Sequence, residues 1–495
     1  MSILAIDLGT QSVRAAIVEI NGEIRALSQI IQEVNTPNLG WAQQKPETWW
    51  DLTKTAIKQL ISTAKEDINN IQGICTCGQM HGPVGLDNQG KITTEWTQIW
   101  IDKRSESICE EFRRNFNEYE LANEITGNPI TTGWPGVKIR WIKEHQPKIY
   151  KKSRWFLVPK DFINFKLTGI AATDPSEASG TYVYDYKTDN YSEKMANLLE
   201  IDIEKFAPIY NSFDVIGSIS THIANKLGLP PNLPVIAGGG DFIVSLLGLG
   251  LIDDTTAVDM TGTSTLFVVH KELPIIHPLV QNLRHVIKGW APFTMLDCGG
   301  LSMQWFKEFL NSISDEEITY EKMIKLAETV PIGSEGLLFY PYMLGERRKE
   351  NILARGAFYG LTLNHKVAHF SRAIMEGVAL ALGNDVKTFK KVGVRVQKVF
   401  CVGGATRNKL LYQIKADVMQ LPQLITDQPE SSLEGCGLLA AYGLHLIKDI
   451  TSVNQTNASK KIIYYPNSSH SEQYEKLQNK FNKMYDHMLG YHNQN

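Results

Sequence analysis

The chain has 495 residues, more than one hydrophobic core usually organises, so about two or three domains are expected. Its composition, 43% hydrophobic and 21% charged, is that of an ordinary globular protein. The net charge of −3 gives no electrostatic basis for binding nucleic acid or an anionic membrane. The longest apolar stretch, near residues 242–252, is too short and too rich in glycine for a membrane span.

The N-terminus and the cysteines indicate a cytoplasmic location. The chain starts without the basic residues and the apolar run of a signal peptide. Its six cysteines are scattered, with Cys75 and Cys77 the only close pair, and none has zinc or disulfide spacing. This pattern is typical of a reducing compartment.

The first eighty residues predict an α/β arrangement that begins with antiparallel hairpins, unlike a simple Rossmann unit. The expected elements are strands at 3–7 and 12–20, a third strand after the Asn21-Gly22 turn, a helix from Pro46 to about 64, and a strand at 71–79.

A second copy of this opening is visible at 256–270, again a strand, a Gly-Thr loop and a strand. Gly9-Thr10 and Gly262-Thr263 occupy matching places in the two copies, which predicts two similar domains that face one cleft. The copies differ in one respect, because Asp7 precedes its glycine by two residues and Met260 holds that place in the second copy. The two halves therefore cannot have identical chemical roles.

The last part of the chain predicts further strands and helices. They are a strand at 398–402, a glycine loop at 403–408, a helix to about 419, a helix near 434 and a surface helix at 471–487.

The two Gly-Thr loops suit phosphate binding, because glycine lets backbone N–H groups approach an anion and the hydroxyls add donors. Arg14, just beyond the first loop, adds a cation for phosphoryl oxygens. Either loop alone could be an ordinary hairpin, but two matched loops and an acid at the end of the first strand favour a site. No GxxxxGK[ST] sequence occurs, so the chain is not a P-loop enzyme.

Asp241 follows three consecutive glycines at the end of an apolar strand, so a ligand could approach its carboxylate closely. Asp7 and Asp241 together could manage a magnesium ion and the proton of an attacking hydroxyl. The alternative is a flexible linker with Asp241 as a helix N-cap, and that role is compatible with catalysis.

Two further segments offer polar groups for a sugar. His81 lies in Gln79-Met80-His81 at the end of a strand, where α/β proteins usually bind ligands, although a lone histidine is more often structural. Asp102, with Arg104 close by, offers a carboxylate for sugar hydroxyls, and its alternative reading is a surface ion pair.

Taken in order, these motifs resemble the FGGY carbohydrate kinases, and within them the xylulokinases. The resemblance covers nearly the whole chain and includes AIDLGTQSVR, GQMHG, WIDKR, VPKDFINFKLTG, ATDPSEASGTY, AGGGD, TGTS and CVGGATRN. GQMHG followed by WxDxR indicates a ketose kinase rather than a glycerol kinase. GQMHG also occurs in sedoheptulokinases, so it leaves the sugar's length open.

The resemblance implies a role for each matching residue. Asp241 is the implied proton acceptor and Asp7 the second catalytic acid, and both are implied metal ligands for Mg²⁺. The implied sugar contacts are Met80, His81, Asp102 and Asp241. The implied ATP contacts are Thr10, Gln11, Arg14, Gly262, Thr263, Gly403, Gly404 and Asn408.

The implied fold is α/β, with duplicated actin-like, ribonuclease-H-like ATPase domains and a ligand cleft between them. The expected boundaries are 1–245, 254–447 and a tail at 448–495. The implied partners are ATP and a small sugar, with no nucleic acid or membrane, and a homodimer is left open.

The implied reaction is ATP-dependent phosphorylation of a ketose, with D-xylulose giving D-xylulose 5-phosphate as the first hypothesis. Phe242 stands where xylulokinases usually have Asn or Gln, and this departure keeps ribulose, sedoheptulose or a polyol open. A sugar-binding regulator without activity and an actin-like or chaperone-like ATPase are further alternatives. The retained acids argue against the regulator, and the GQMHG and WIDKR segments argue against the ATPase.

Overall fold

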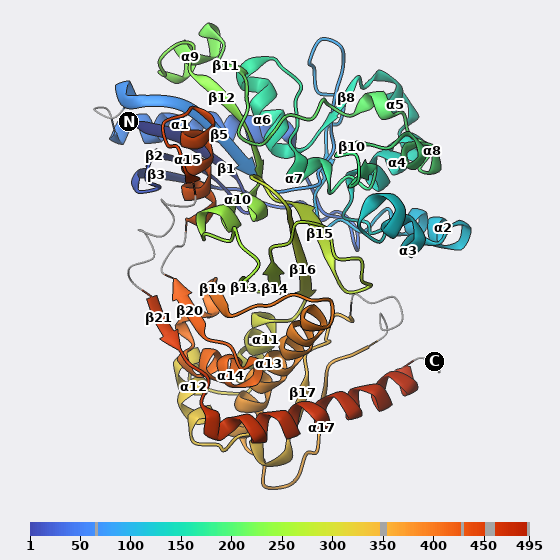
Figure 1. Ribbon diagram of the computed structural model, residues 1–495, viewed down its shortest axis with the longest axis vertical. Helices are drawn as coiled ribbons and strands as arrows, with labels where there is room; N and C mark the ends of the chain where they lie inside the picture. The colour runs from blue at the N-terminus through green and yellow to red at the C-terminus, as the bar shows by residue number, and fades with distance from the viewer. Residues whose placement is uncertain (65–67, 347–353, 427–429, 451–460, 493–495) are drawn as a thin grey trace. The chain divides into compact units, whose positions relative to one another are not determined.

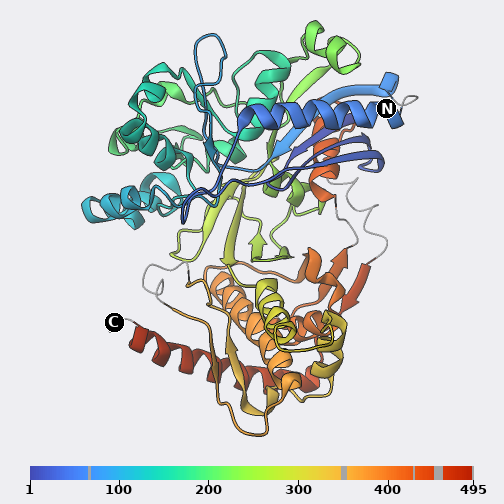
Figure 2. The same cartoon turned by 180° about the vertical axis from the view of Figure 1, so that it is seen from behind.

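The computed structural model describes residues 1–64, 68–346, 354–426, 430–450 and 461–492. The chain folds into two compact units (Figures 1 and 2). The first, unit 1, comprises Met1–Ile252, Lys271–Ala291 and Glu430–Asn457, and the second, unit 2, comprises Asp253–His270, Pro292–Pro429 and Ala458–Asn495.

The domain boundaries expected from the sequence remain a prediction. The compact units divide the chain differently, because 271–291 and 430–450 pack with the N-terminal residues and 461–492 belong to unit 2. Residues 451–460 and 493–495 of the predicted tail lie outside the described residues.

Unit 1 contains a six-stranded sheet with the strand order β11-β12-β5-β1-β2-β3. Its strands are β1 (Ser2–Leu8), β2 (Ser12–Glu19), β3 (Ile24–Ile31), β5 (Ile71–Gly78), β11 (Val215–Ser218) and β12 (Pro234–Gly240). β1, β5 and β12 are parallel, whereas β2, β3 and β11 join as antiparallel neighbours.

The helices of unit 1 cover both faces of this sheet. α1 and α6 pack against one face, and α10 and α15 pack against the other. Unit 1 contains α1 (Pro46–Thr63), α2 (Glu106–Asn115), α4 (Pro135–His145), α5 (Pro147–Lys152), α6 (Pro159–Thr168), α7 (Pro175–Ala178), α8 (Glu193–Leu198), α9 (Thr221–Leu227), α10 (Asp241–Gly248) and α15 (Ser431–Gly443).

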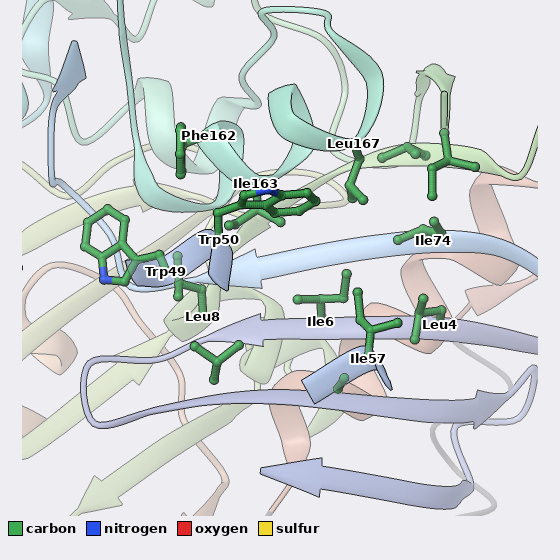
Figure 3. Close-up of a cluster of buried hydrophobic side chains, with 14 of the residues drawn as sticks. Leu4, Ile6, Leu8, Trp49, Trp50, Ile57, Ile74, Phe162, Ile163 and Leu167 are labelled. Atoms are coloured by element: carbon green, nitrogen blue, oxygen red, sulfur yellow. The ribbon is translucent and has the colours of Figure 1, made fainter. Parts of the chain in front are cut away.

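The alternation of side chains along β1 separates the core from the site. Leu4, Ile6 and Leu8 point toward the apolar side chains of α1 and α6 and form one buried cluster with them (Figure 3). Because successive side chains of a strand point to opposite faces, Asp7 lies on the other face, toward α15. The core therefore fixes where the first candidate acid points.

Unit 2 repeats this sheet. Its strands follow the order β16-β14-β13-β19-β20-β21, with β13, β19 and β20 parallel and β14, β16 and β21 antiparallel to their neighbours. The strands are β13 (Thr256–Thr261), β14 (Thr265–Val269), β16 (Trp290–Leu296), β19 (Lys398–Val402), β20 (Gln423–Thr426) and β21 (Lys461–Tyr464). The internal duplication predicted from the sequence is thereby confirmed at the level of strand order and direction.

The helices of unit 2 include the longest in the described part of the chain. The elements are α11 (Gly300–Asn311), α12 (Tyr320–Glu328), α13 (Val367–Lys391), α14 (Lys409–Met419) and α17 (Ser468–His492), with a small hairpin of β17 (Leu338–Tyr340) and β18 (Ala357–Tyr359). α13 is buried along most of its length and contacts α11, α12, α14 and β17, so it forms the centre of this unit. No helix among the described residues is long and apolar enough to cross a membrane.

Candidate active site

The first candidate acid, Asp7, is buried at the end of β1. Its Oδ2 accepts a hydrogen bond from Ser432 Oγ of α15 at 2.7 Å and forms an ion pair with Arg14, which lies directly opposite on β2. Its Oδ1 is also buried but accepts no hydrogen bond from the described residues. A buried carboxylate oxygen without a donor is unusual, and it leaves one position where a cation or a water could bind.

Arg14, a predicted phosphate contact, is held by acids in this structure. It pairs with Asp7 and, at 2.5 Å, with Glu430 at the start of α15. Burial alone would lower the pKa of Arg14, but the two carboxylates raise it above its ordinary value. The guanidinium therefore stays charged and is fixed at the edge of the first Gly-Thr loop.

The three glycines before Asp241 let β12 pass close to its neighbours. Gly238 has φ +73°, and a Cβ there would lie 1.9 Å from the backbone oxygen of Thr76, so only glycine fits this β-bulge. A Cβ on Gly240 would lie 2.5 Å from the sulfur of Met80. The glycines thus bring the Met80 side chain next to the backbone that carries Asp241.

Asp241 is the first residue of α10, so the helix begins at the predicted proton acceptor. Its Oδ1 accepts the backbone N–H of Phe242 at 2.6 Å, and the side chain is partly exposed. Burial raises the pKa of Asp241 to about 7, and the nearby charge of Asp7 adds to this, while the Phe242 N–H and Arg14 act in the opposite direction. A carboxylate with a pKa near neutrality is a better proton acceptor than an ordinary aspartate.

A buried polar network fixes the backbone of the residues that precede Asp241. Ser176 Oγ accepts the N–H of Gly240 at 3.0 Å and donates to Asp174 at 2.7 Å. Lys160 pairs with Asp174 at 2.9 Å and donates to the oxygen of Ala237 at 3.0 Å. The sequence analysis assigned no role to these residues. They lie in the VPKDF and ATDPSEAS motifs, and the charged residues of these motifs were the available signal.

Met80 and His81, the two predicted sugar contacts next in the chain, follow β5 after Gln79. Met80 is buried against Gly240, and His81 has a left-handed backbone with φ +72°. Burial lowers the pKa of His81 to about 3, and the charge of Lys138 adds to this, so the ring is neutral at pH 7. Its Nδ1 is buried and has no hydrogen-bond partner among the described residues, which leaves one ring nitrogen for a ligand.

Asp102, a predicted sugar contact, has both oxygens engaged. It accepts the N–H of Ala42 at 2.6 Å and four contacts from the backbone and guanidinium of Arg104 at 2.7–3.0 Å. Arg104 in turn lies over the ring of Trp41, 3.7 Å from its centroid. The pair is buried rather than at the surface, so this geometry favours a supporting role for Asp102 over direct contact with a ligand.

The first Gly-Thr loop is linked to the Asp102 segment. Thr10 Oγ1 accepts a hydrogen bond from the indole N–H of Trp100 at 3.0 Å, and its backbone oxygen accepts from Gln44. Gln11 is exposed. The loop therefore has a fixed base and an accessible tip.

The unit 2 loops lie against each other. Gly403 has φ +100°, and a Cβ there would lie 2.5 Å from the oxygen of Thr261, next to Gly262. Gly300, at the start of α11, donates its N–H to the Gly262 oxygen at 2.9 Å, and a Cβ on it would lie 2.3 Å from that oxygen. Gly262 and Gly403 therefore lie side by side, and Gly300 is a neighbour that the sequence analysis missed.

The other residues of these loops differ in which of their backbone and side-chain groups remain accessible. Thr263 accepts the N–H of Leu301 through its backbone oxygen, and Asn408 caps α14 by accepting the N–H of Leu411 at 3.0 Å. Beside Gly404 there is open space where a side chain would stand. These contacts leave the Gly404 backbone accessible within unit 2.

A cavity of about 600 Å³ in unit 1 lies apart from all of these groups. It is lined by Asn88, 151–154, Glu193, 196–197 and 201–205, none of which is a predicted site residue. The candidate site is therefore identified by its chemistry and not by its volume.

Comparison with known proteins agrees with this geometry. The N-terminal domain of the FGGY family of carbohydrate kinases matches residues 2–248, and the C-terminal domain of that family matches residues 257–444. The chain is 29% identical to a xylulose kinase of Bacillus subtilis over 489 residues, which is 98% of this chain and 97% of that protein. It is 26% identical to a gluconokinase of the same organism over 461 residues, 91% of this chain and 89% of that protein.

A solved structure gives the same result. The crystal structure of xylulose kinase from Rhodospirillum rubrum superimposes with a TM-score of 0.93 at 27% identity, covering 99% of this chain and 100% of that one. The two-domain α/β fold of these kinases is thus confirmed. Because both family domains match in order and together span most of the sequence, the chain belongs to the FGGY family of carbohydrate kinases and is a carbohydrate kinase.

Proposed function

We propose that the protein transfers the γ-phosphoryl group of ATP to a terminal hydroxyl of a ketose, with D-xylulose as substrate and D-xylulose 5-phosphate as product. The observation that carries this proposal is Asp241, partly exposed after its glycines, with a pKa raised to about 7 and Asp7 as a close neighbour. The choice of xylulose is supported by the xylulose kinases that match over nearly their whole length.

In this mechanism Asp241 accepts the proton of the attacking hydroxyl. The hydroxyl oxygen forms a bond to the γ-phosphorus while the bond from that phosphorus to the bridging oxygen of ADP breaks. The proton moves to the carboxylate of Asp241, which must therefore be ionised when the sugar binds. The hydrogen bond from the Phe242 N–H orients this carboxylate.

Asp7 and Asp241 are the residues that would hold Mg²⁺. They fit this ion, because Mg²⁺ is usually bound by one or two carboxylates together with phosphate oxygens and water, and Asp7 Oδ1 is a buried oxygen without a donor among the described residues. When bound, the ion would neutralise charge on the phosphoryl oxygens. Arg14 fixes the orientation of Asp7 from β2.

Each unit offers backbone groups for ATP. In unit 1 we assign Thr10, Gln11 and Arg14 to the phosphates. In unit 2 we assign Gly262 and Thr263 to the phosphates, and Gly403, Gly404 and Asn408 to the adenosine. The close approach of Gly403 to Thr261 supports the unit 2 assignment, because both loops lie at one end of their sheet.

On the sugar side we assign Met80 and His81 as contacts. The neutral ring of His81 can donate or accept a hydrogen bond, and its Nδ1 has no partner in the described part of the chain. Asp102 remains a predicted contact only, since Arg104 and Ala42 already engage both of its oxygens. We also propose a cytoplasmic location, which the six free cysteines support.

The test is an ADP-release assay of the purified protein with ATP and Mg²⁺ over D-xylulose, D-ribulose, sedoheptulose, gluconate and glycerol. We expect D-xylulose to give the highest kcat/KM and a 5-phosphate product by NMR. A higher value for gluconate or another sugar would reject xylulose and keep the kinase. ATP hydrolysis that no sugar accelerates would reject sugar phosphorylation itself.

A further inference from the structure

Helix α4 (Pro135–His145) and the residue before it present two side chains to His81. Trp134, the residue before the helix, meets the His81 ring edge-on with centroids 5.1 Å apart. Lys138 lies four residues later, on the same side of the helix, and its Nζ donates to the backbone oxygen of His81 at 2.9 Å. The start of α4 therefore contacts both the ring and the backbone of the histidine.

Lys138 also reaches the second sugar-side segment. Its Nζ donates to the backbone oxygen of Ile99 at 3.0 Å, three residues before Asp102. The side chain is fully buried, with 0% exposure, so its removal would leave both carbonyls without this buried donor. A single side chain thus joins the segment after β5 to the segment that carries Trp100 and Asp102.

The backbone of His81 needs such support. A φ of +72° is uncommon for a residue with a side chain, and it costs free energy unless the surroundings fix it. Space around the ring is also limited, because a Cβ on Gly180 would lie 2.6 Å from His81 Cε1. Lys138 therefore holds the backbone of His81, while Trp134 and Gly180 lie against its ring.

We propose that Lys138 is a positioning residue for sugar binding, which acts by holding His81 in its left-handed conformation and by fixing the distance between the His81 and Asp102 segments. This inference rests on the proposed assignment of His81 to the sugar. Lys138 itself does not touch the substrate in this proposal; it acts through the two carbonyl groups that it binds.

The competing explanation is that Lys138 only stabilises the fold. The two explanations differ in which kinetic constant changes. Loss of a positioning residue raises the KM for the sugar and leaves the KM for ATP nearly unchanged, whereas general destabilisation reduces the amount of active enzyme and alters neither KM.

The experiment compares Lys138→Met and Lys138→Gln with Lys143→Met as the matched control. Lys143 lies on the same helix but donates to the backbone oxygen of Glu200. For Lys138→Met we expect the KM for the best sugar of the panel to rise about tenfold or more, with the KM for ATP within about threefold of wild type. Lys138→Gln, whose amide can still donate, should lie between, and the control should match wild type.

A crystal structure of Lys138→Met gives a readout that does not depend on activity. We expect His81 to leave the left-handed region or its ring to move from Trp134. This measurement keeps the two proposals separate. A wild type that phosphorylates no sugar would reject the proposed function, but the crystal structure would still test whether Lys138 holds the conformation of His81.

Three outcomes would overturn the inference. The first is an unchanged sugar KM in folded Lys138→Met, and the second is an equal rise in the KM values for sugar and ATP. The third is failure of both Lys138 variants to fold while Lys143→Met folds, because this would assign the residue a purely structural role.

Discussion

The two sheets share strand order and strand direction, yet each treats a buried acid differently. In unit 1, Asp7 lies two residues before the loop glycine, on the face toward α15, and keeps one oxygen without a donor among the described residues. In unit 2, Met260 occupies that place, and Asp259 lies one residue earlier, where it pairs with Lys415 at 2.6 Å and accepts from Thr261 at 2.6 Å. Since neighbouring side chains of a strand point to opposite faces, a shift of one residue converts a candidate metal ligand into a structural ion pair.

The largest effect on the reaction rate should come from a substitution in unit 1, at Asp241. We expect Asp241→Asn to reduce sugar phosphorylation on the order of 10²–10⁴-fold, because loss of a general base typically costs this much. ATP binding, measured by calorimetry, should persist. Turnover near the wild-type value in the purified variant would remove Asp241 from the mechanism.

The same kind of substitution in unit 2 should affect stability instead. Asp259→Asn leaves the charge of Lys415 buried without its partner, which typically costs about 3–5 kcal/mol, measured by urea unfolding. The kcat of the folded fraction should stay within about twofold of wild type, since Asp259 has no assigned chemical role. The double variant Asp259→Leu/Lys415→Met is the control and should regain much of the stability. A large loss of kcat without loss of stability would mean that Asp259 has a chemical role, as proposed for Asp7, and is not only a structural ion pair.

The pH dependence should report the raised pKa of Asp241. Because the ionised carboxylate is the base, kcat/KM for the sugar should fall about tenfold per unit as pH decreases below about 7 and level off above it. The sign for stability is opposite: an acid whose pKa is raised by folding destabilises the protein as pH rises from the ordinary aspartate range through about 7. Asp241→Asn should therefore raise the Tm more near pH 8 than near pH 5. A rate that is flat down to pH 5 would contradict this assignment.

The smallest effect is expected at Phe242, the residue after the proposed base Asp241, and it concerns the preference among sugars. The Phe242 side chain is partly exposed, whereas Ile243 and Val244 are fully buried, which favours a ring that faces the site over one packed in the core. Phe242→Asn should change the rank order of xylulose, ribulose and sedoheptulose by about tenfold, because an amide can bond a hydroxyl and a phenyl ring cannot. Phe242→Leu is the control and should keep the order. A uniform loss over all sugars with a lower Tm would mean core packing.

Much of the fold could be predicted because its signals are local. The strand at 398–402 and the helix that starts at Pro46 were expected where β19 and α1 lie, since alternation and a proline at the helix start are read within a few residues. The duplication was visible for the same reason, as two similar strand–loop–strand segments.

The parts of the site that could not be predicted depend on contacts between distant segments. Nothing near Lys138 indicates that it reaches His81 and Ile99, and nothing near Ser176 indicates that it holds Gly240. The expectation that Asp102 contacts a sugar did not include the N–H of Ala42, which lies sixty residues away along the chain and donates to it. Sequence patterns gave the residue types of the site, and tertiary packing decides which of their atoms remain available.

α15 packs in unit 1 although it lies late in the sequence, and this affects when unit 1 can be completed during synthesis. α15 (Ser431–Gly443) packs on α10 and β1, with a Cβ on Gly435 only 2.1 Å from the Val244 oxygen, and it supplies Ser432 to Asp7. A ribosome that has released the first 252 residues has therefore delivered most of unit 1 without the helix that completes its acid site. We expect the growing chain to keep that face uncovered until translation nears its end, so that a shortened product lacking α15 would depend on chaperones and would have no kinase activity.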